Sequence, residues 1–494
     1  MKAATTHDYY LVIQRSVWLV GFVLLTCLLY GLLEDELLAA ATCGVMSVLA
    51  LLAWSVRQRA LLVTLPALAF VLGNVLCLGV FNYLYVNFTT FLKGSYHELT
   101  AWLTALMGWA AAFGCIGADA VLRKPRQQDP AASSEFIRSP ELLWVTGACF
   151  FSVLGMEFAL GLLNARYDPD TWRRGPSGLI YTLHGITNAT YIFFVALGAQ
   201  IRDRFAAPRN WAILALVAAC LVATGLTGGR EMGIRMLVLM AAGAAAAGMS
   251  PWRLAVLGSA SVVVGSVFFM VVGAIRGDEL FAGGSIDDKI TAVRAASEGE
   301  QGIGAVGDRS GFEATVLRVF EGFAQVVIDD TEFTGRRAGF ENFDRLAYLF
   351  IPNALAPDKR PLNDGPEILA RDYGATIDDS TSVPITLVAD AHRRGGAPWV
   401  FVVGLLSGIV WRLSVQAITL AMPDMALPTV LLLTVVALRT YSASALGVFD
   451  VMIYRTGKVA VLVGALAAVA RLLAYLRANM RPADARGGPR LPTR

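Results

Sequence analysis

The stretch that runs from Ile275-Arg276-Gly277-Asp278 to His392-Arg393-Arg394-Gly395-Gly396 is polar, whereas the sequence on both sides of it is apolar. Charged and titratable side chains are denser in residues 276–396 than elsewhere in the chain. The flanking sequence consists mainly of apolar runs of about 20 residues, the length that a helix needs to cross a bilayer. We therefore expect residues 276–396 to form a loop outside the membrane, which is also where chemistry would take place.

The composition of the whole chain agrees with this division. The chain has 494 residues, of which 56% are hydrophobic and 16% are charged, and its mean hydropathy is +0.58. Soluble domains carry about 25% charged residues, so the sequence predicts a polytopic membrane protein. A net charge of +3 without a basic and aromatic stripe excludes a nucleic-acid partner.

The apolar runs predict an all-α protein with about 12 transmembrane helices. Residues 1–275 hold the first nine helices, residues 276–396 form a large and partly helical loop, residues 397–476 hold the last three helices, and residues 477–494 form a disordered tail. The expected spans are 16–33, 37–54, 60–86, 101–122, 141–163, 180–201, 211–227, 233–249, 254–275, 397–420, 425–441 and 457–476. The first run is expected to be retained, because no convincing cleavage site accompanies it.

The distribution of lysine and arginine predicts the orientation of these spans. On one side of the membrane, Arg57, Arg123, Arg202, Arg412 and the tail from Arg471 onward lie near the ends of the spans, whereas the other side is poorer in lysine and arginine. Basic connections face the cytoplasm. Both termini are therefore predicted to be cytoplasmic and residues 276–396 extracytoplasmic.

Several kinds of site are not indicated by the sequence. The six cysteines all lie in apolar runs, so neither a disulfide framework nor a Cys-x-x-Cys metal site is expected. The phosphate-binding pattern of ATPases is missing. No cofactor and no metal site are predicted.

The loop itself has helical and turn patterns. Apolar residues at helical spacing predict a helix over residues 312–328, and a second helix is expected at 340–350, before Pro352. Two prolines that bracket three charges predict a turn at residues 356–361. A short helix is expected at 383–394, leading back into the membrane.

Arginines at the outer ends of predicted spans oppose the usual charge bias. They are Arg230, Arg235, Arg276, Arg439 and Arg455. An arginine at the bilayer centre costs about 2.5–3.5 kcal/mol on insertion scales. Guanidinium groups match the geometry of phosphate oxygens, so the set predicts an anion site. The alternative is that each arginine pairs with an acid such as Glu157, Glu231 or Asp450.

Residues 315–396 resemble the Wzy-type oligosaccharide repeat-unit polymerases of bacterial inner membranes. The matching residues are Thr315-Val316-Leu317-Arg318-Val319-Phe320-Glu321-Gly322, Leu349 to Lys359, Asn363, Tyr373-Gly374 and Thr381-Ser382-Val383-Pro384. The turn Gly228-Gly229-Arg230 is also similar to an outward corner of that family. The resemblance implies about a dozen spans, inward termini and a fold like that of the lipid-dependent glycosyltransferase C class. This chain departs from the family at Asp390-Ala391-His392-Arg393-Arg394, where a glutamate and a less basic re-entry are expected.

The resemblance implies a function, namely the polymerisation of undecaprenyl-diphosphate-linked repeat units into O-antigen, capsule or exopolysaccharide. Arg230, Arg276, Arg318 and Arg439 are expected to bind the diphosphate. His392, Asp390 and Glu321 are the candidates for the base that deprotonates the acceptor hydroxyl. His392 could equally be an interfacial hydrogen-bonding histidine, and Arg318 could pair only with Glu321, three residues away on one helix face.

Other functions remain open at this stage. A ligase that passes finished glycan to another acceptor would use the same donor, and a transporter of lipid-linked sugars would show internal repeats and paired broken helices. A structural subunit of an envelope assembly would not need arginines at membrane ends. The expected partners are the lipid-linked oligosaccharide and membrane lipids, together with the flippase and the chain-length regulator that the resemblance implies.

Overall fold

The structure is a computed structural model that describes residues 6–58, 60–80, 83, 97–122, 135–159, 190–201, 207–226, 230–275, 323–348, 351, 364–373, 385–438 and 440–479. All regular structure within these ranges is helical. Among these residues, five helices are long and apolar enough to cross a membrane: Glu36–Arg57, Leu61–Val80, Glu98–Val121, Ala397–Ala421 and Ala445–Arg477. Shorter apolar helices lie on six further predicted spans. The prediction of an all-helical chain is confirmed for the described residues, and the five long apolar helices agree with a membrane protein. The count of twelve spans stays a prediction.

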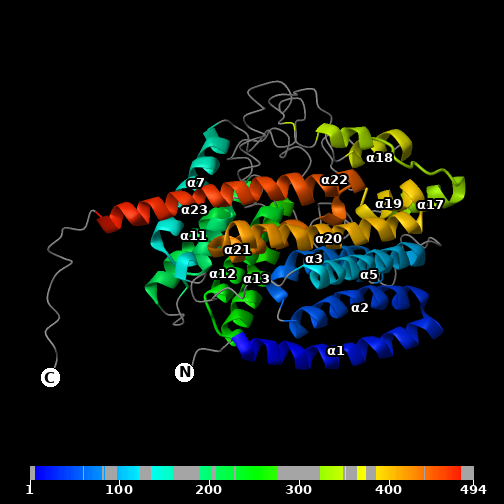
Figure 1. The fold of residues 1–494 in the computed structure, drawn as a ribbon, viewed down its shortest axis with the longest axis horizontal. Helices are drawn as coiled ribbons and strands as arrows, with labels where there is room; N and C mark the ends of the chain where they lie inside the picture. The colour runs from blue at the N-terminus through cyan, green and yellow to red at the C-terminus, as the bar shows by residue number, and fades with distance from the viewer. Residues whose placement is uncertain are drawn as a thin grey trace.

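The N-terminal helices form one side of the bundle, and the first of them lies outermost (Figure 1). They are α1 (Thr6–Glu34), α2 (Glu36–Arg57), α3 (Leu61–Val75) with η1 (Leu76–Val80), and α5 (His97–Val121). Asp35 separates α1 from α2, because its carboxylate caps α2 by accepting a hydrogen bond from the amide of Leu38 at 3.0 Å.

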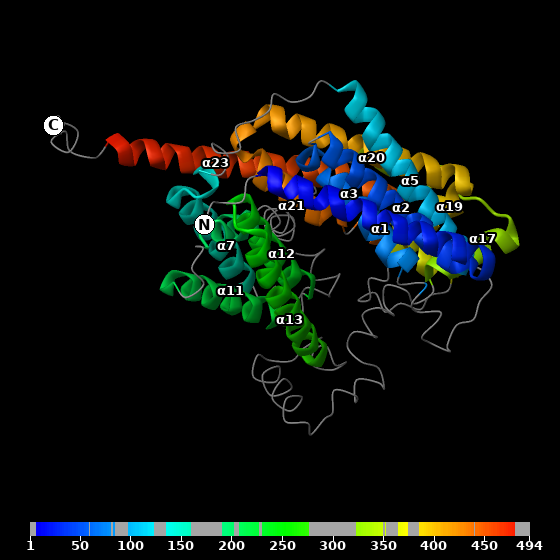
Figure 2. The same cartoon turned by 90° about the horizontal axis from the view of Figure 1, so that it is seen from below.

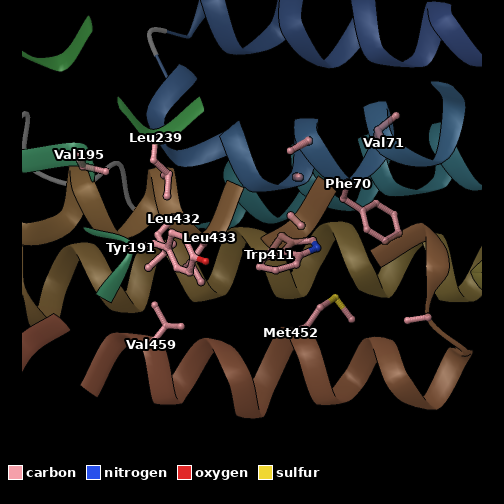
Figure 3. Packing of buried hydrophobic residues seen from close by; sticks show 14 of the residues in the cluster. Phe70, Val71, Tyr191, Val195, Leu239, Trp411, Leu432, Leu433, Met452 and Val459 are labelled. Carbon is pink, nitrogen blue, oxygen red and sulfur yellow. The ribbon is translucent and has the colours of Figure 1, made fainter. Parts of the chain in front are cut away.

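The central and C-terminal helices complete the bundle. They are α7 (Pro140–Ala159), α10 (Ile192–Gly198), α11 (Pro208–Leu226), α12 (Arg230–Ala246), α13 (Pro251–Ile275), α20 (Ala397–Ala421), η4 (Pro423–Met425), α21 (Ala426–Leu438), η5 (Thr440–Ser442), α22 (Ala445–Phe449), η6 (Asp450–Arg455) and α23 (Thr456–Asn479). Trp411 of α20 lies in the core between Phe70 and Val71 of α3 and Met452 of η6 (Figure 3).

The described part of the polar loop contains α17 (Phe323–Thr334), η3 (Phe343–Tyr348), α18 (Gly365–Tyr373) and α19 (Leu387–Gly395). These elements gather at the end of the bundle where α20 begins, and α23 ends at the opposite end (Figures 1 and 2). The helix predicted at 383–394 is confirmed by α19. The helix predicted at 340–350 is wrong in type, because only the short 3₁₀ turn η3 forms there.

Helices α5 and α20 pack closely and run in the same direction, as the predicted topology requires of these two spans. Gly404 lies against the backbone of Met107, and Gly408 lies against the backbone of Ala111. A Cβ atom on Gly408 would be 2.0 Å from the carbonyl oxygen of Ala111. Small residues four apart allow the backbones of two membrane helices to approach in this way.

A buried ion pair between Arg412 of α20 and Asp119 of α5 joins the two helices nearer to their C-terminal ends. Nε of Arg412 donates to Oδ1 of Asp119 at 2.8 Å, and Nη1 donates to Oε1 of Gln416 at 3.0 Å. The Arg412 side chain is fully buried. The sequence places Arg412 among the charges near the cytoplasmic ends of the spans, and the structure shows that it is buried and paired with Asp119. The apolar sequence around Arg412 gives no indication of its partner Asp119, whose carboxylate offsets the cost of burying the guanidinium group.

We expect Gly408→Ala to destabilise the protein and Gly117→Ala to leave it unchanged or slightly more stable. Both substitutions add the helix propensity of alanine, which is about 1 kcal/mol. Only Gly408 faces a backbone oxygen, since nothing lies within 4 Å of a Cβ at Gly117. Overpacking of this kind costs about 1–3 kcal/mol. The measurement is the melting temperature of each purified variant in detergent, and equal values would show that α5 and α20 do not pack this closely.

Candidate functional site

The site is built around α19, whose residues from Leu387 to Arg394 are all buried. Thr386 caps the helix, with its hydroxyl accepting from the amide of Ala389 at 3.4 Å, and it does so at φ 63. A β-branched residue at positive φ is strained, and such strain persists only where the surroundings fix the backbone. At the other end, Gly396 takes φ 71 and the chain enters α20 at once.

A segment of the loop covers the C-terminal end of α19. The amides of Ala338 and Gly339 donate to the carbonyl oxygens of Arg393 and Arg394 at 3.0 and 2.9 Å. These carbonyls would otherwise lack partners at the helix end. The backbone contact places Glu341 and Asn342 beside the charged residues of α19.

Asp390 is fully buried and accepts hydrogen bonds on both oxygens. Oδ2 accepts from Nε of Arg394 at 3.0 Å and from the amide of Ala445 at 2.8 Å, and Oδ1 accepts from Nε of Arg393 at 3.3 Å. Asp390 thus ties the loop to the start of α22. Because both of its oxygens already accept hydrogen bonds in a fully buried position, we assign Asp390 a structural role in place of the base predicted as one alternative.

Arg394 is also fully buried and joins three parts of the chain. Its Nη1 donates to the carbonyl oxygen of Glu341 at 2.6 Å, and its Nη2 lies 3.4 Å from Oδ2 of Asp364. Asp364 in turn accepts from Nδ2 of Asn342 at 2.8 Å. Burial and the nearby charge of Asp390 raise the pKa of Asp364 above its usual value.

A second layer of ion pairs surrounds Arg393. Its Nη1 donates to Oε2 of Glu341 at 2.9 Å and lies 3.5 Å from Asp372. Arg371 binds the same two carboxylates, at 2.6 Å for Glu341 and 2.5 Å for Asp372. Burial acts to raise the pKa of Glu341, but the hydrogen bonds from Arg371 and Arg393 outweigh it and the pKa is lowered.

Within the described part of the loop, these arginines are therefore matched by carboxylates, as is Arg345 by Glu367 at 3.0 Å. A cluster compensated in this way does not itself form the cationic pocket that the sequence predicts. The residues predicted for that pocket are Arg230, Arg276, Arg318 and Arg439. Arg230 is the first residue of α12, but its side chain lies outside the described part of the chain, as do Arg276, Arg318, Arg439 and the candidate base Glu321.

Two further arginines predicted at outer helix ends are described. Nε of Arg455 donates to Oδ2 of Asp450 at 2.7 Å, so the pairing alternative holds there. Arg235 is buried, with its guanidinium carbon 5.2 Å from the ring centre of Tyr191.

His392 lies on α19 beside α17, in a different chemical setting from Asp390. Its Nε2 is 3.1 Å from Oε1 of Glu332, which also accepts from Nη2 of Arg337 at 2.8 Å. Nη1 of Arg337 donates to the carbonyl oxygen of His392 at 3.3 Å. Nδ1 of His392 is buried and has no hydrogen-bond partner among the described residues.

The electrostatics of this array keep the imidazole neutral at pH 7. Burial lowers the pKa of His392 below 6.5, Arg337 lowers it further, and Glu332 opposes both. A neutral imidazole that donates from Nε2 to a carboxylate carries its lone pair on Nδ1. The unprotonated nitrogen of the ring is therefore Nδ1, which is buried. Asp329 lies on α17 one helical turn before Glu332, and burial raises the pKa of its carboxyl group to about 6.

The sequence singled out His392 but missed Glu332 and Arg337. Both follow the end of the helix predicted at 312–328, where α17 continues to Thr334. The acidic run Asp329-Asp330-Thr331-Glu332 was the available signal. Among the described residues, no group of three or more metal-ligating side chains has a geometry suited to a metal ion.

Comparisons of the chain with protein-family models, with curated proteins and with solved structures found no match.

Proposed function

We propose that this membrane protein is a glycosyltransferase that polymerises undecaprenyl-diphosphate-linked oligosaccharide repeat units at the outer face of the bacterial inner membrane. The observation that supports it best is the array of His392, Glu332 and Arg337 at the end of the helix bundle. It offers a neutral base on a rigid support, beside helices that a lipid-linked substrate can approach from the bilayer.

In the proposed reaction, the side chains that bury Nδ1 of His392 move aside as the incoming repeat unit binds, and Nδ1 accepts the proton of a sugar hydroxyl on that unit. The hydroxyl oxygen forms a bond to the anomeric carbon of the growing chain, and the bond between that carbon and the diphosphate oxygen breaks. Undecaprenyl diphosphate leaves with the electron pair. General-base catalysis of this kind contributes about 10²–10⁴-fold.

The diphosphate is assigned to the arginines that the sequence predicts for it: Arg230, Arg276, Arg318 and Arg439. The charge balance of the α19 cluster supports the assignment of the diphosphate to arginines outside that cluster. Since Arg393 and Arg394 are committed to carboxylates, the leaving group needs other cations.

The test is the glycan pattern of a strain that lacks this protein. A polymerase predicts single repeat units that accumulate on the lipid carrier, and a plasmid copy restores long chains. Long lipid-linked chains that are no longer transferred to their acceptor would instead indicate a ligase, and an unchanged pattern would exclude both.

We expect Glu332→Gln and Arg337→Gln to shift the pH dependence of transfer in opposite directions. The base works when His392 is neutral, so activity falls as pH decreases through its pKa. Glu332 raises that pKa and Arg337 lowers it. Loss of Glu332 should therefore move the acidic limb to lower pH, and loss of Arg337 should move it to higher pH. Rates measured over pH 4.5–8 (a range set by the usual pKa of histidine near 6.5) test this, and shifts of the same sign would contradict the assignment.

A further inference from the structure

Three aromatic side chains, of which Phe340 is exposed and Phe343 and Trp399 are half-buried, lie next to the charged cluster at the start of α20. The rings of Phe340 and Trp399 are 5.1 Å apart, and Phe343 lies 5.3 Å from Phe340 and 6.0 Å from Trp399. Phe340 is 71% exposed although it belongs to this packed group. We call Phe340, Phe343 and Trp399 the aromatic group.

The aromatic group continues the outward-facing apolar stripe of α20. Exposed apolar residues follow one face of that helix at Val402, Leu406, Leu413 and Leu420. Trp399 precedes Val402 by three residues and Leu406 by seven, so it lies on the same face. In a membrane-spanning helix, an exposed apolar stripe contacts lipid. The surface that contains Phe340 is therefore continuous with a lipid-facing surface.

We propose that Phe340 and Trp399 insert into the boundary between the lipid headgroups and the acyl chains, and that they set the depth of the charged cluster. Aromatic side chains favour this level of the bilayer, because their rings are apolar and large. The inference does not depend on the proposed enzymatic function.

The connection from the bilayer boundary to the cluster is short. The guanidinium carbon of Arg394 lies 5.3 Å from the ring centre of Phe343, and Arg394 binds Asp390 and Asp364. The indole of Trp399 packs directly against Gly395, and a Cβ atom at position 395 would overlap the indole ring. This contact fixes the position of Trp399. The cluster is consequently held at the level of the lipid headgroups, the level that a diphosphate on a lipid carrier occupies.

The test uses spin labels in a variant without native cysteines, reconstituted into nanodiscs. Labels are placed at Phe340, at Val402 and Leu413 on the stripe, and at Glu367, which is exposed on α18. Collision rates with oxygen and with a water-soluble nickel chelate report depth. We expect Leu413 to be deepest, Val402 shallower, Phe340 at the boundary, and Glu367 in water.

Two outcomes overturn the proposal. A label at Phe340 with the same accessibility as that at Glu367 would place it in water. A label hidden from both reagents would show that protein, from this chain or a second copy, covers it. Because cysteine removal could disturb the fold, the unaltered protein is also irradiated with a phospholipid that carries a photoreactive group near the headgroup. The expected result is lipid attached to the peptides that contain Phe340 and Trp399, and its absence from both contradicts the proposal.

Discussion

Arg394→Met should destabilise the folded protein by about 3–5 kcal/mol, because it leaves Asp390 and Asp364 buried without their shared guanidinium partner. Methionine keeps much of the side-chain volume, so the effect isolates the lost charge and hydrogen bonds. The hydrogen bond to the carbonyl oxygen of Glu341 is lost as well, which removes one of the contacts between α19 and the loop segment that covers it. The measurement is the melting temperature of the purified protein in detergent.

Arg371→Met is the matched control. It removes a guanidinium group from the same network, but that side chain is 47% exposed and its carboxylate partners retain Arg393 or water. Exposed ion pairs contribute about 0–1 kcal/mol. Equal melting temperatures for the two variants would show that the cluster around α19 is not buried as described.

His392→Gln should reduce glycan transfer by about 10²–10⁴-fold while the melting temperature stays close to that of the wild type. Glutamine can still hydrogen-bond to Glu332 but accepts no proton at neutral pH. The measurement is the distribution of glycan chain lengths in the complemented deletion strain, with the amount of protein in the membrane determined in parallel. The control is His7→Gln in the first turn of α1, which should support normal chains. Normal chains with His392→Gln would remove this residue from the reaction.

The sequence predicts the helices well because apolar runs and helical spacing are local signals. Residues 383–394 illustrate this, since their pattern predicted α19 to within a few residues. The Gly404 and Gly408 pair was also a readable signal for close packing with another helix, although it does not name α5 as the partner.

The site could be predicted only in part, because its contacts join residues far apart in the chain. The charge density drew attention to Asp390, His392, Arg393 and Arg394, which the structure brings together on α19. Their partners Glu341, Asp364 and Ala445 come from other segments, and a single sequence does not indicate which carboxylate faces which guanidinium. For the same reason, Asp390 looked like a possible base, whereas its hydrogen bonds give it a structural role.

The most direct test of the account is transfer by the purified protein. The deletion strain supplies the substrate, since it should accumulate lipid-linked repeat units that can be extracted and added to the protein in nanodiscs. We expect a ladder of longer lipid-linked chains with the wild type and one undecaprenyl diphosphate released for each transfer, and both products formed about 10²–10⁴-fold more slowly with His392→Gln. A ladder of equal length and rate from both proteins, or none from the wild type, would contradict it.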